Sequence, residues 1–223
     1  MKQTLEPLLD KNLKMRKTLL FLLILSSALL QAQIKAITDQ GDEVILYTNG
    51  TWKYLNKIPD ASTIQENSTK FTKSESAGFL LKSKILKVGF WLDPQKWSFK
   101  KAVSNEDAEF ELQLKEEGDV YAVIIVEKFP FPLEALRHIA VENLRTMIPD
   151  VEIVKEEYRN VNGLKILMLE MNGLFHGAEF TFLGYYYSGK DGAVQYTVYT
   201  SPEILETQRS QVEQLLNGFV EID

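Results

Sequence analysis

Apolar and polar positions alternate along much of the second half of the chain, which predicts a series of β-strands. In "AEFELQLK" the apolar Phe110, Leu112 and Leu114 lie on one face, and charged or amide side chains lie on the other. A strand of this kind has one face in water. The next segment, "VYAVIIVEK", is apolar on both faces, which indicates a central strand. Two further strands are predicted, over 84–92 and, at a sheet edge, over 97–101.

Two segments repeat apolar residues at steps of three and four, which predicts amphipathic helices over 132–149 and 201–219. In the second, Ser201 is expected to cap the helix, with Pro202 at the first helical position. Gly218 is expected to end it in a left-handed conformation. The apolar stripes are Leu133, Leu136, Ala140, Leu144 and Met147 in the first helix, and Leu205, Val212, Leu215, Leu216 and Phe219 in the second.

Between the helices, strands are predicted over 151–158, 164–175, 178–188 and 193–200. Several of them are apolar on both faces, as in "LKILMLEM", so their sheet needs cover on both sides. Their connections have hairpin length, which favours antiparallel pairing. The fold class expected for 76–223 is therefore α+β, with a mostly antiparallel sheet covered by helices on both faces.

The segment "AITDQGDEVILYTNGTWKYL" predicts a small β-meander over 33–56. Asn49-Gly50 between two β-prone runs is a strong hairpin signal, because a two-residue turn of this kind needs positive φ at both central positions. Side chains that lie opposite each other across the hairpin share a face. The predicted opposite pairs are Tyr47 with Trp52 and Ile45 with Tyr54, and a third strand is predicted over 34–38.

Three short strands bury little surface by themselves, so the aromatic face of the meander must pack against something. It either docks within the chain or contacts a partner, or a polymer such as a glycan, through Trp52 and Tyr54. The stretch resembles short "DGTW"-type N-terminal segments of many exported bacterial proteins, with Asn49 in place of Asp. This resemblance implies export and no particular activity.

The start of the chain resembles a secretory signal. Arg16 and Lys17 precede an apolar run from Leu19 to Leu30, whose twelve residues would span roughly 18 Å as a helix, short of a bilayer core of about 30 Å. Cleavage is expected close to Ala32. The segment after the meander is rich in Ser, Thr and charge, which predicts a flexible linker. The expected division is 1–32 as start-site extension and signal peptide, 33–56 as meander, 57–75 as linker and 76–223 as the main domain.

Composition narrows the location and the partners. The sequence has no cysteine, so it cannot be a lipoprotein anchored at that residue, and we expect a periplasmic or extracellular protein without disulfides. A retained membrane anchor is the alternative, which the polar residues after Leu30 disfavour. Without the leader the chain has 20 basic and 29 acidic residues, which argues against nucleic acid and anionic lipid as partners.

The sequence has no recognisable catalytic or metal-binding pattern. Cysteine nucleophiles are excluded, and a serine triad would need one of the two histidines. His138 is expected on the solvent side or margin of the first helix, and His176 in an exposed tight turn. The acidic run "SNEDAEFE" lacks the glycine turn of a calcium loop and continues into a strand. We therefore expect no enzymatic activity, no cofactor and no metal.

Aromatic residues remain as candidates for contact with a partner or ligand. Tyr185 and Tyr187 lie on one face of their predicted strand and Tyr186 lies on the other. Their rings are expected to pack beneath helices with the hydroxyls at the rim, or alternatively to line a ligand groove. Trp91 and Trp97 flank "LDPQK" and are candidates for an exposed apolar lip. The candidate contact residues are Tyr47, Trp52, Tyr54, Trp91, Trp97, Tyr185 and Tyr187.

The order of the predicted elements over 76–223 resembles the PsbP-like fold. The segments that carry the resemblance are "ENLRTMIPDVEIVKEEYRNVNGLKILMLEM", "GYYYSGKDGAVQYTVYT" and "VEQLLNGF". Relatives tend to show a Pro-x-x-Trp step after the first strand, and here Pro94 and Trp97 occupy it with little glycine around them. The fold occurs in an extrinsic photosystem II subunit, a Ran-binding nuclear transport factor and exported bacterial proteins. The resemblance implies an accessory or binding subunit without chemistry of its own.

Two hypotheses about function follow. In the first, the chain is an exported accessory protein that binds an unknown protein partner of the cell envelope through the sheet edge or the Trp-bearing hairpin. In the second, it is a carrier or sensor that holds a small apolar ligand between sheet and helix, near Tyr185 and Tyr187.

Overall fold

The computed structural model describes residues 34–37, 43–47, 50, 52–54, 64–116 and 118–222. The chain divides into two units, Met1–Pro59 and Asp60–Asp223, which are described separately. The predicted signal peptide lies outside the described residues. Neither helix of the described part is long and apolar enough to cross a membrane.

The first unit contains the predicted three-stranded antiparallel sheet. Its strands are β1 (Ile34–Ile37), β2 (Glu43–Leu46) and β3 (Trp52–Tyr54), in the spatial order β1-β2-β3. Val44 and Ile45 on β2 are each only 5% exposed, so the middle strand supplies buried apolar surface.

The register of the β2–β3 hairpin differs from the prediction by one residue. Leu46 lies opposite Trp52, and Val44 lies opposite Tyr54. The N–H of Gly50 donates to the carbonyl of Tyr47 at 3.0 Å, and Gly50 has a φ of +80°. A left-handed glycine after a turn is typical of a three-residue hairpin loop, which is one residue longer than the predicted turn. The predicted pairs, Tyr47 with Trp52 and Ile45 with Tyr54, are therefore wrong.

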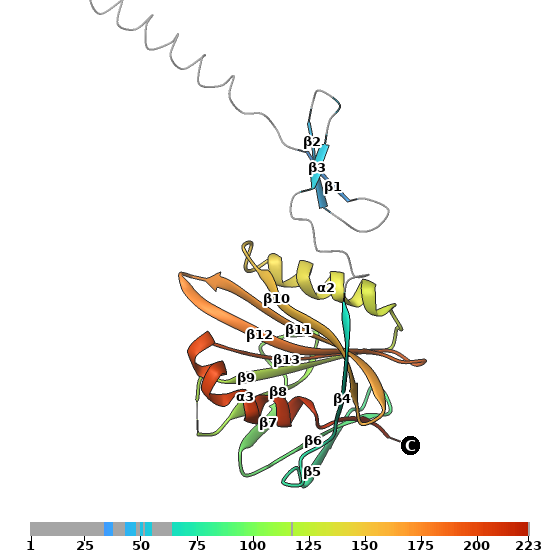
Figure 1. Cartoon of the computed structure of the whole chain (residues 1–223), viewed down its shortest axis with the longest axis vertical. Coiled ribbons are helices and arrows are strands. Elements are labelled where there is room, and N and C mark those ends of the chain that lie inside the picture. The colour runs from blue at the N-terminus through green and yellow to red at the C-terminus, as the bar shows by residue number, and fades with distance from the viewer. Residues whose placement is uncertain are drawn as a thin grey trace, which may run out of the picture. The chain divides into compact units, whose positions relative to one another are not determined.

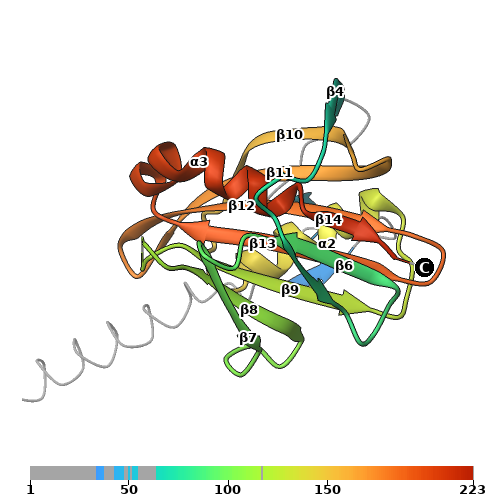
Figure 2. The same ribbon diagram turned by 90° about the horizontal axis from the view of Figure 1, so that it is seen from below.

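The second unit is built on an eight-stranded sheet (Figures 1 and 2). Its strands are β4 (Gln65–Phe71), β7 (Trp97–Lys101), β8 (Ala108–Leu114), β9 (Tyr121–Glu127), β10 (Glu152–Val161), β11 (Leu164–Phe175), β12 (Ala178–Ser188) and β13 (Ala193–Thr200). The spatial order is β4-β10-β11-β12-β13-β9-β8-β7, and every neighbouring pair is antiparallel except β4 with β10. The sheet is therefore mixed, with β9 inside it and β7 at an edge, as predicted.

Strand β4 lies within the segment 57–75, which the sequence analysis assigned to a linker. That assignment is wrong for residues 65–71, which pair with β10. Five of the seven β4 side chains are exposed, so the segment carries no apolar alternation that would predict a strand. Backbone pairing at a sheet edge does not need an apolar face, which explains why composition gave no signal.

Helix α2 (Leu133–Arg145) and helix α3 (Pro202–Leu216) lie on opposite sides of the large sheet (Figure 1). Helix α2 contacts β11 and β12, whereas α3 contacts β12 and β13. On the α3 side, a second sheet supplies further cover with β5 (Phe79–Lys82), β6 (Val88–Leu92) and β14 (Phe219–Glu221), in the order β14-β6-β5. The α+β class is confirmed. The expected cover of both faces by helices is not what the structure has, because α2 covers only part of its side and strands share the other.

Two local predictions for the helices are wrong. Met147 is 62% exposed because α2 ends at Arg145, so the predicted apolar stripe stops before it. Gly218 is not among the described residues with positive φ. A Cβ at Gly218 would lie 1.9 Å from the carbonyl oxygen of Trp91, so glycine is needed there for the close approach of β6. The predicted cap is confirmed, since the Ser201 hydroxyl accepts from the N–H of Ile204 at 3.3 Å.

The turn between β10 and β11 joins distant segments. Asn162 and Gly163 have φ of 50° and 89°, as an Asn-Gly turn requires. The Asn162 Nδ2 donates to the carbonyls of Asn217 and Phe219, each at 2.8 Å. Its Oδ1 accepts from the N–H of Lys73 at 3.0 Å. One side chain therefore ties this hairpin to the end of α3, to β14 and to the segment after β4.

Candidate functional site

The predicted contact residues of the first unit lie on its second and third strands. Trp52 is 53% exposed on β3, and Tyr47 is half-buried just after β2. Tyr54 belongs to β3, but its side chain lies outside the described residues. Because of the register, Trp52 shares a face with Leu46, which is 37% exposed. The exposed aromatic surface described in this unit is therefore centred on Trp52 and Leu46.

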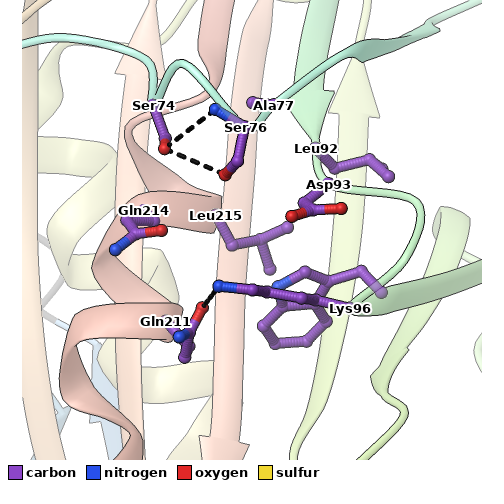
Figure 3. A pocket seen from close by; sticks show the side chains of 10 residues that line it. Ser74, Ser76, Ala77, Leu92, Asp93, Lys96, Gln211, Gln214 and Leu215 are labelled. Carbon is purple, nitrogen blue, oxygen red and sulfur yellow. Dashed lines mark hydrogen bonds between the residues drawn. The ribbon is translucent and has the colours of Figure 1, made fainter.

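Trp91 and Trp97 do not form an exposed lip. Trp97 is 3% exposed and belongs to the main core. Trp91 is half-buried, and the Lys73 ammonium lies 5.0 Å from its ring centroid. A hollow next to Trp97 is lined by polar and apolar side chains, with the Lys96 Nζ donating to the Gln211 Oε1 at 2.8 Å (Figure 3). Its volume of about 10 Å³ is close to that of one water molecule, so it is too small for a ligand.

The Tyr185 ring packs beneath a helix, as the sequence analysis predicted. It is 1% exposed, and its hydroxyl donates to the Oδ1 of Asn217 at the end of α3, at 2.8 Å. The same hydroxyl accepts from the Nη1 of Arg159 at 2.8 Å. Burial raises the pKa of Tyr185 to about 12, so the phenol stays protonated. Its surroundings are filled by protein groups, which leaves no groove for a ligand at this ring.

Tyr187 borders a larger hollow, of about 230 Å³, between the β12–β13 turn, the segment before β6 and the end of β14. Tyr187 is 8% exposed, and its hydroxyl donates to the carboxylate of Glu221. Burial and the neighbouring Glu221 raise the pKa of this tyrosine. Lys87 and Asp191 also line the hollow. It is polar, open to solvent and unlike a site for a small apolar ligand.

The side of the sheet that carries α2 has an open half. The strands next to α2 are dry, with Leu167 and Leu169 fully buried on β11. Farther along the same face, Tyr121, Val123 and Ile125 of β9 are only half-buried, whereas their neighbours Ala122, Ile124 and Val126 on the other face are buried. Strand β9 is therefore apolar on both faces, as predicted, but α2 does not reach this part of it.

Three aromatic side chains cross this open half in one row, formed by Phe182, Tyr199 and Tyr121 (the aromatic row). They are direct cross-strand neighbours on β12, β13 and β9. The rings of Phe182 and Tyr199 are 6.1 Å apart at 25°, and those of Tyr199 and Tyr121 are 5.6 Å apart at 22°. Such pairs stabilise a sheet beyond the burial of their area. Phe180 extends the row along β12 with its ring centroid 6.4 Å from that of Phe182.

The stacking decides what the aromatic row can bind. Because the rings are stacked side by side, the ring faces between neighbours are occupied by one another. A glycan needs exposed ring faces, so this row does not suit sugar stacking. Ring edges beside Val123 and Ile125 suit the apolar side chains of another protein. Sequence reasoning missed the aromatic row, because the register that aligns these three residues was not known.

A charged group borders the open half on β8. Glu111 accepts from the N–H of Val103 at 3.0 Å and of Ser104 at 2.7 Å, and pairs with Lys100 at 3.0 Å. The Lys100 ammonium and these two amides lower the pKa of Glu111 to about 2. Burial and the Glu111 charge raise the pKa of Tyr199. Glu111 is therefore a carboxylate that fastens a loop, at the end of the acidic run "SNEDAEFE".

The two histidines lie apart from these features. His176 is exposed in the β11–β12 turn with a φ of 51°, as predicted. His138 is half-buried on α2. Among the described residues, no three His, Cys, Asp or Glu side chains come together in a group that could hold a metal.

The geometry defines an α+β domain in which one half of a sheet face carries half-buried apolar and aromatic side chains. No family model and no curated protein matches the sequence. Among solved structures, cyanobacterial PsbP (CyanoP) from Synechocystis sp. PCC 6803 is similar, with a TM-score of 0.52 and 14% identity over 64% of this chain and 91% of that chain. LpqN, involved in cell envelope biogenesis of Mycobacterium tuberculosis, has a TM-score of 0.47 and 10% identity over 64% and 88%. The similarity to CyanoP confirms the PsbP-like fold.

Proposed function

We propose that this chain is an exported, non-enzymatic accessory protein of the cell envelope that binds a protein partner through the open half of its large sheet. The observation that carries the proposal is the aromatic row and its apolar neighbours on β9, which are only half-buried beside α2. An apolar face on a central strand is favourable only when other protein groups cover it and exclude water.

Two further features support this reading. The PsbP-like fold also occurs in proteins that act as accessory or binding subunits, which supports the proposal. The Tyr185 hydroxyl and the Arg159 charge are held by structural hydrogen bonds, so they are not arranged around a space where a substrate could react. The signal-like leader supports export. The alternative of an apolar-ligand carrier is less well supported, because the space around Tyr185 is filled and the hollow at Tyr187 is polar.

The experiment is a capture assay with matched variants. Wild-type protein, Val123→Lys and Val154→Lys are immobilised and exposed to an envelope extract of the native host. Val123 lies half-buried on the open half, whereas Val154 is 51% exposed on β10, which three strands separate from β9. We expect wild type and Val154→Lys to retain one partner in stoichiometric amount, and Val123→Lys to retain about tenfold less of it, because a lysine would have to be desolvated in the contact.

Circular dichroism and thermal unfolding of the three proteins serve as the fold control. Equal retention by Val123→Lys and wild type would show that the partner binds elsewhere. Turnover of any substrate by the pure protein, lost on changing His138 or His176, would overturn the non-enzymatic part of the proposal.

A further inference from the structure

Strand β4 differs from every other strand of the large sheet. It forms one edge of the sheet, next to β10 (Figure 2). Its pairing with β10 is the one parallel pairing in the described sheet. Parallel pairs are slightly less stable per residue than antiparallel pairs. Five of its seven side chains are exposed, so burial adds little to its attachment.

The pairing of β4 with β10 is broken in the middle. Gln65 and Glu66 pair with Glu157 and Tyr158, and pairing resumes with Lys70 opposite Asn160. Three β4 residues, 67–69, therefore lie across from one β10 residue. The Asn67 Oδ1 accepts from the N–H of Thr69 at 2.9 Å, so this stretch satisfies part of its own hydrogen bonding. Such an interruption shortens the continuous ladder and lowers the cost of local opening.

Besides the exposed ion pair of Glu66 with Lys165, at 2.9 Å, three buried or half-buried side chains at fixed spacing hold β4 in place. Ile64, just before the strand, is 9% exposed. The Asn67 Nδ2 donates to the Glu157 Oε1 at 3.1 Å. The ring of Phe71 lies over the guanidinium of Arg159, with its centroid 4.5 Å from the Cζ, a cation–π contact. The anchors thus form the pattern of an apolar residue, an amide three residues later and an aromatic ring four residues after that.

The charge beneath β4 is paired without it. Arg159 is 4% exposed, and its Nε donates to the Glu157 carboxylate at 2.5 Å. Its Nη1 donates to the Tyr185 hydroxyl at 2.8 Å and lies 3.5 Å from the Glu213 carboxylate. Removing a partner from a buried charge is costly, but these partners stay when β4 leaves. Opening of β4 therefore exposes the edge of β10 without leaving Arg159 unpaired.

The opposite edge of the sheet is closed in another way. Strand β7 is antiparallel to β8 over five consecutive pairs without a break. Lys100 and Lys101 lie on it, and lysines on edge strands oppose pairing with other chains. The backbone pairing of β4 with β10 is therefore weaker than that of β7 with β8. The edge of β10 is the place where another strand can replace β4 and pair with the sheet.

We propose that β4 is an exchangeable strand and that the edge of β10 is a docking site for an extended segment of a protein partner. The partner segment adds as a parallel strand and repeats the β4 anchors: an apolar residue, an amide three residues later, and an aromatic ring over Arg159. This inference extends the proposed role in partner binding. It concerns a different surface, so its test and that of the open half of the sheet can fail independently.

The first measurement is hydrogen exchange of the whole protein. We expect the amides of β4 to exchange about tenfold or more faster than those of β10 and β11, through local opening. Strand β7, the other edge, is the internal control and is expected to exchange more slowly than β4. Exchange of β4 only at the rate of global unfolding would overturn the proposal.

The second measurement uses a labelled synthetic peptide of residues 64–73 as the probe, added to the full chain. In the variant Lys70→Cys/Asn160→Cys a disulfide can lock β4 onto β10, because these residues are register partners and the natural sequence has no cysteine. We expect the peptide to bind the reduced variant and not the oxidised one, which is its own matched control. A peptide with Phe71→Ala is expected to bind about tenfold more weakly, as loss of the cation–π contact and of ring burial implies.

Each other outcome refutes the proposal. Equal binding to oxidised and reduced protein would place the peptide elsewhere, and no binding to either would show that the strand does not exchange. Concentration-dependent dimers of the reduced protein that disappear on oxidation would identify a second copy of this chain as the occupant, in place of a different partner.

Discussion

Tyr185 and Tyr196 offer a sharp test of the energetics of the core. They are direct cross-strand partners on β12 and β13, on the same face, and each is 1% exposed. The Tyr185 hydroxyl bonds to Arg159 and Asn217. The Tyr196 hydroxyl, in contrast, has no hydrogen-bond partner among the described residues. Two chemically identical groups in one core thus have opposite environments.

Replacement of Tyr196 by Phe is expected to stabilise the protein. The hydroxyl loses its hydrogen bonds to water on folding and gains none in the core. An unsatisfied buried polar group of this kind costs about 1–3 kcal/mol, so Tyr196→Phe should recover a similar amount. For a domain of this size that corresponds to a rise in Tm of roughly 2–4 °C per kcal/mol.

Replacement of Tyr185 by Phe is expected to do the reverse. It removes an acceptor from a buried guanidinium and a donor from the Asn217 side chain. Hydrogen bonds to charged groups contribute about 1.5–3 kcal/mol, so the loss should be at least about 2 kcal/mol. Both substitutions remove the same atom, so volume and hydrophobic transfer are matched between them.

The assay is equilibrium unfolding in urea of wild type, the two single variants and the double variant, with unchanged m-values as the sign of an intact two-state transition. The refuting result is a Tyr196→Phe variant that is destabilised to the same degree as Tyr185→Phe. It would mean that the Tyr196 hydroxyl makes a hydrogen bond in the folded protein, and that its assignment as an unsatisfied buried group is wrong.

Two further predictions concern single positions. Glu111 has its pKa lowered from 4.5 to about 2, so its stabilising effect is present above pH 4.5 and is lost as the pH falls toward 2. Glu111→Gln should therefore lower the urea midpoint at neutral pH, and the difference from wild type should vanish near pH 2. Gly218→Ala should cost about 1–3 kcal/mol or more, because its Cβ would overlap the Trp91 carbonyl. Gly78→Ala, whose Cβ would meet nothing closer than 3.9 Å, is the control and should unfold like wild type.

The sequence predicted those parts of the fold that local patterns determine. The alternation around Leu112 predicted a strand with Leu112 and Leu114 on its dry face, and both are buried; the double-sided apolarity of β9 correctly indicated an interior strand. The three- and four-residue steps located both helices, and Ser201 marked the start of α3. These signals depend only on residues that are close in sequence, so they can be recognised without knowledge of the tertiary contacts.

The remaining features depend on partners that are distant in sequence. Strand β4 has no apolar pattern, and its attachment comes from a ring over Arg159, some 90 residues away. The β2–β3 register differs from the predicted one, which placed Asn49 and Gly50 in a two-residue turn, because the strands pair as Leu46 with Trp52 and Val44 with Tyr54. The aromatic row depends on the alignment of three strands, which fixes Tyr121 opposite Tyr199 and Tyr199 opposite Phe182. The sequence contains these residues, but it does not show which of them are neighbours in the folded sheet.

The single amide at Asn162 makes the end of the chain sensitive to slow chemical damage. Deamidation at this Asn-Gly step would replace a donor with a negatively charged acceptor, aimed at two carbonyl oxygens that it now binds. The hairpin and the carboxyl-terminal strand would then repel each other where they are now fastened. This change of one mass unit at one turn would loosen three segments at once. The rate of deamidation at Asn162 would therefore limit how long the folded protein can be stored.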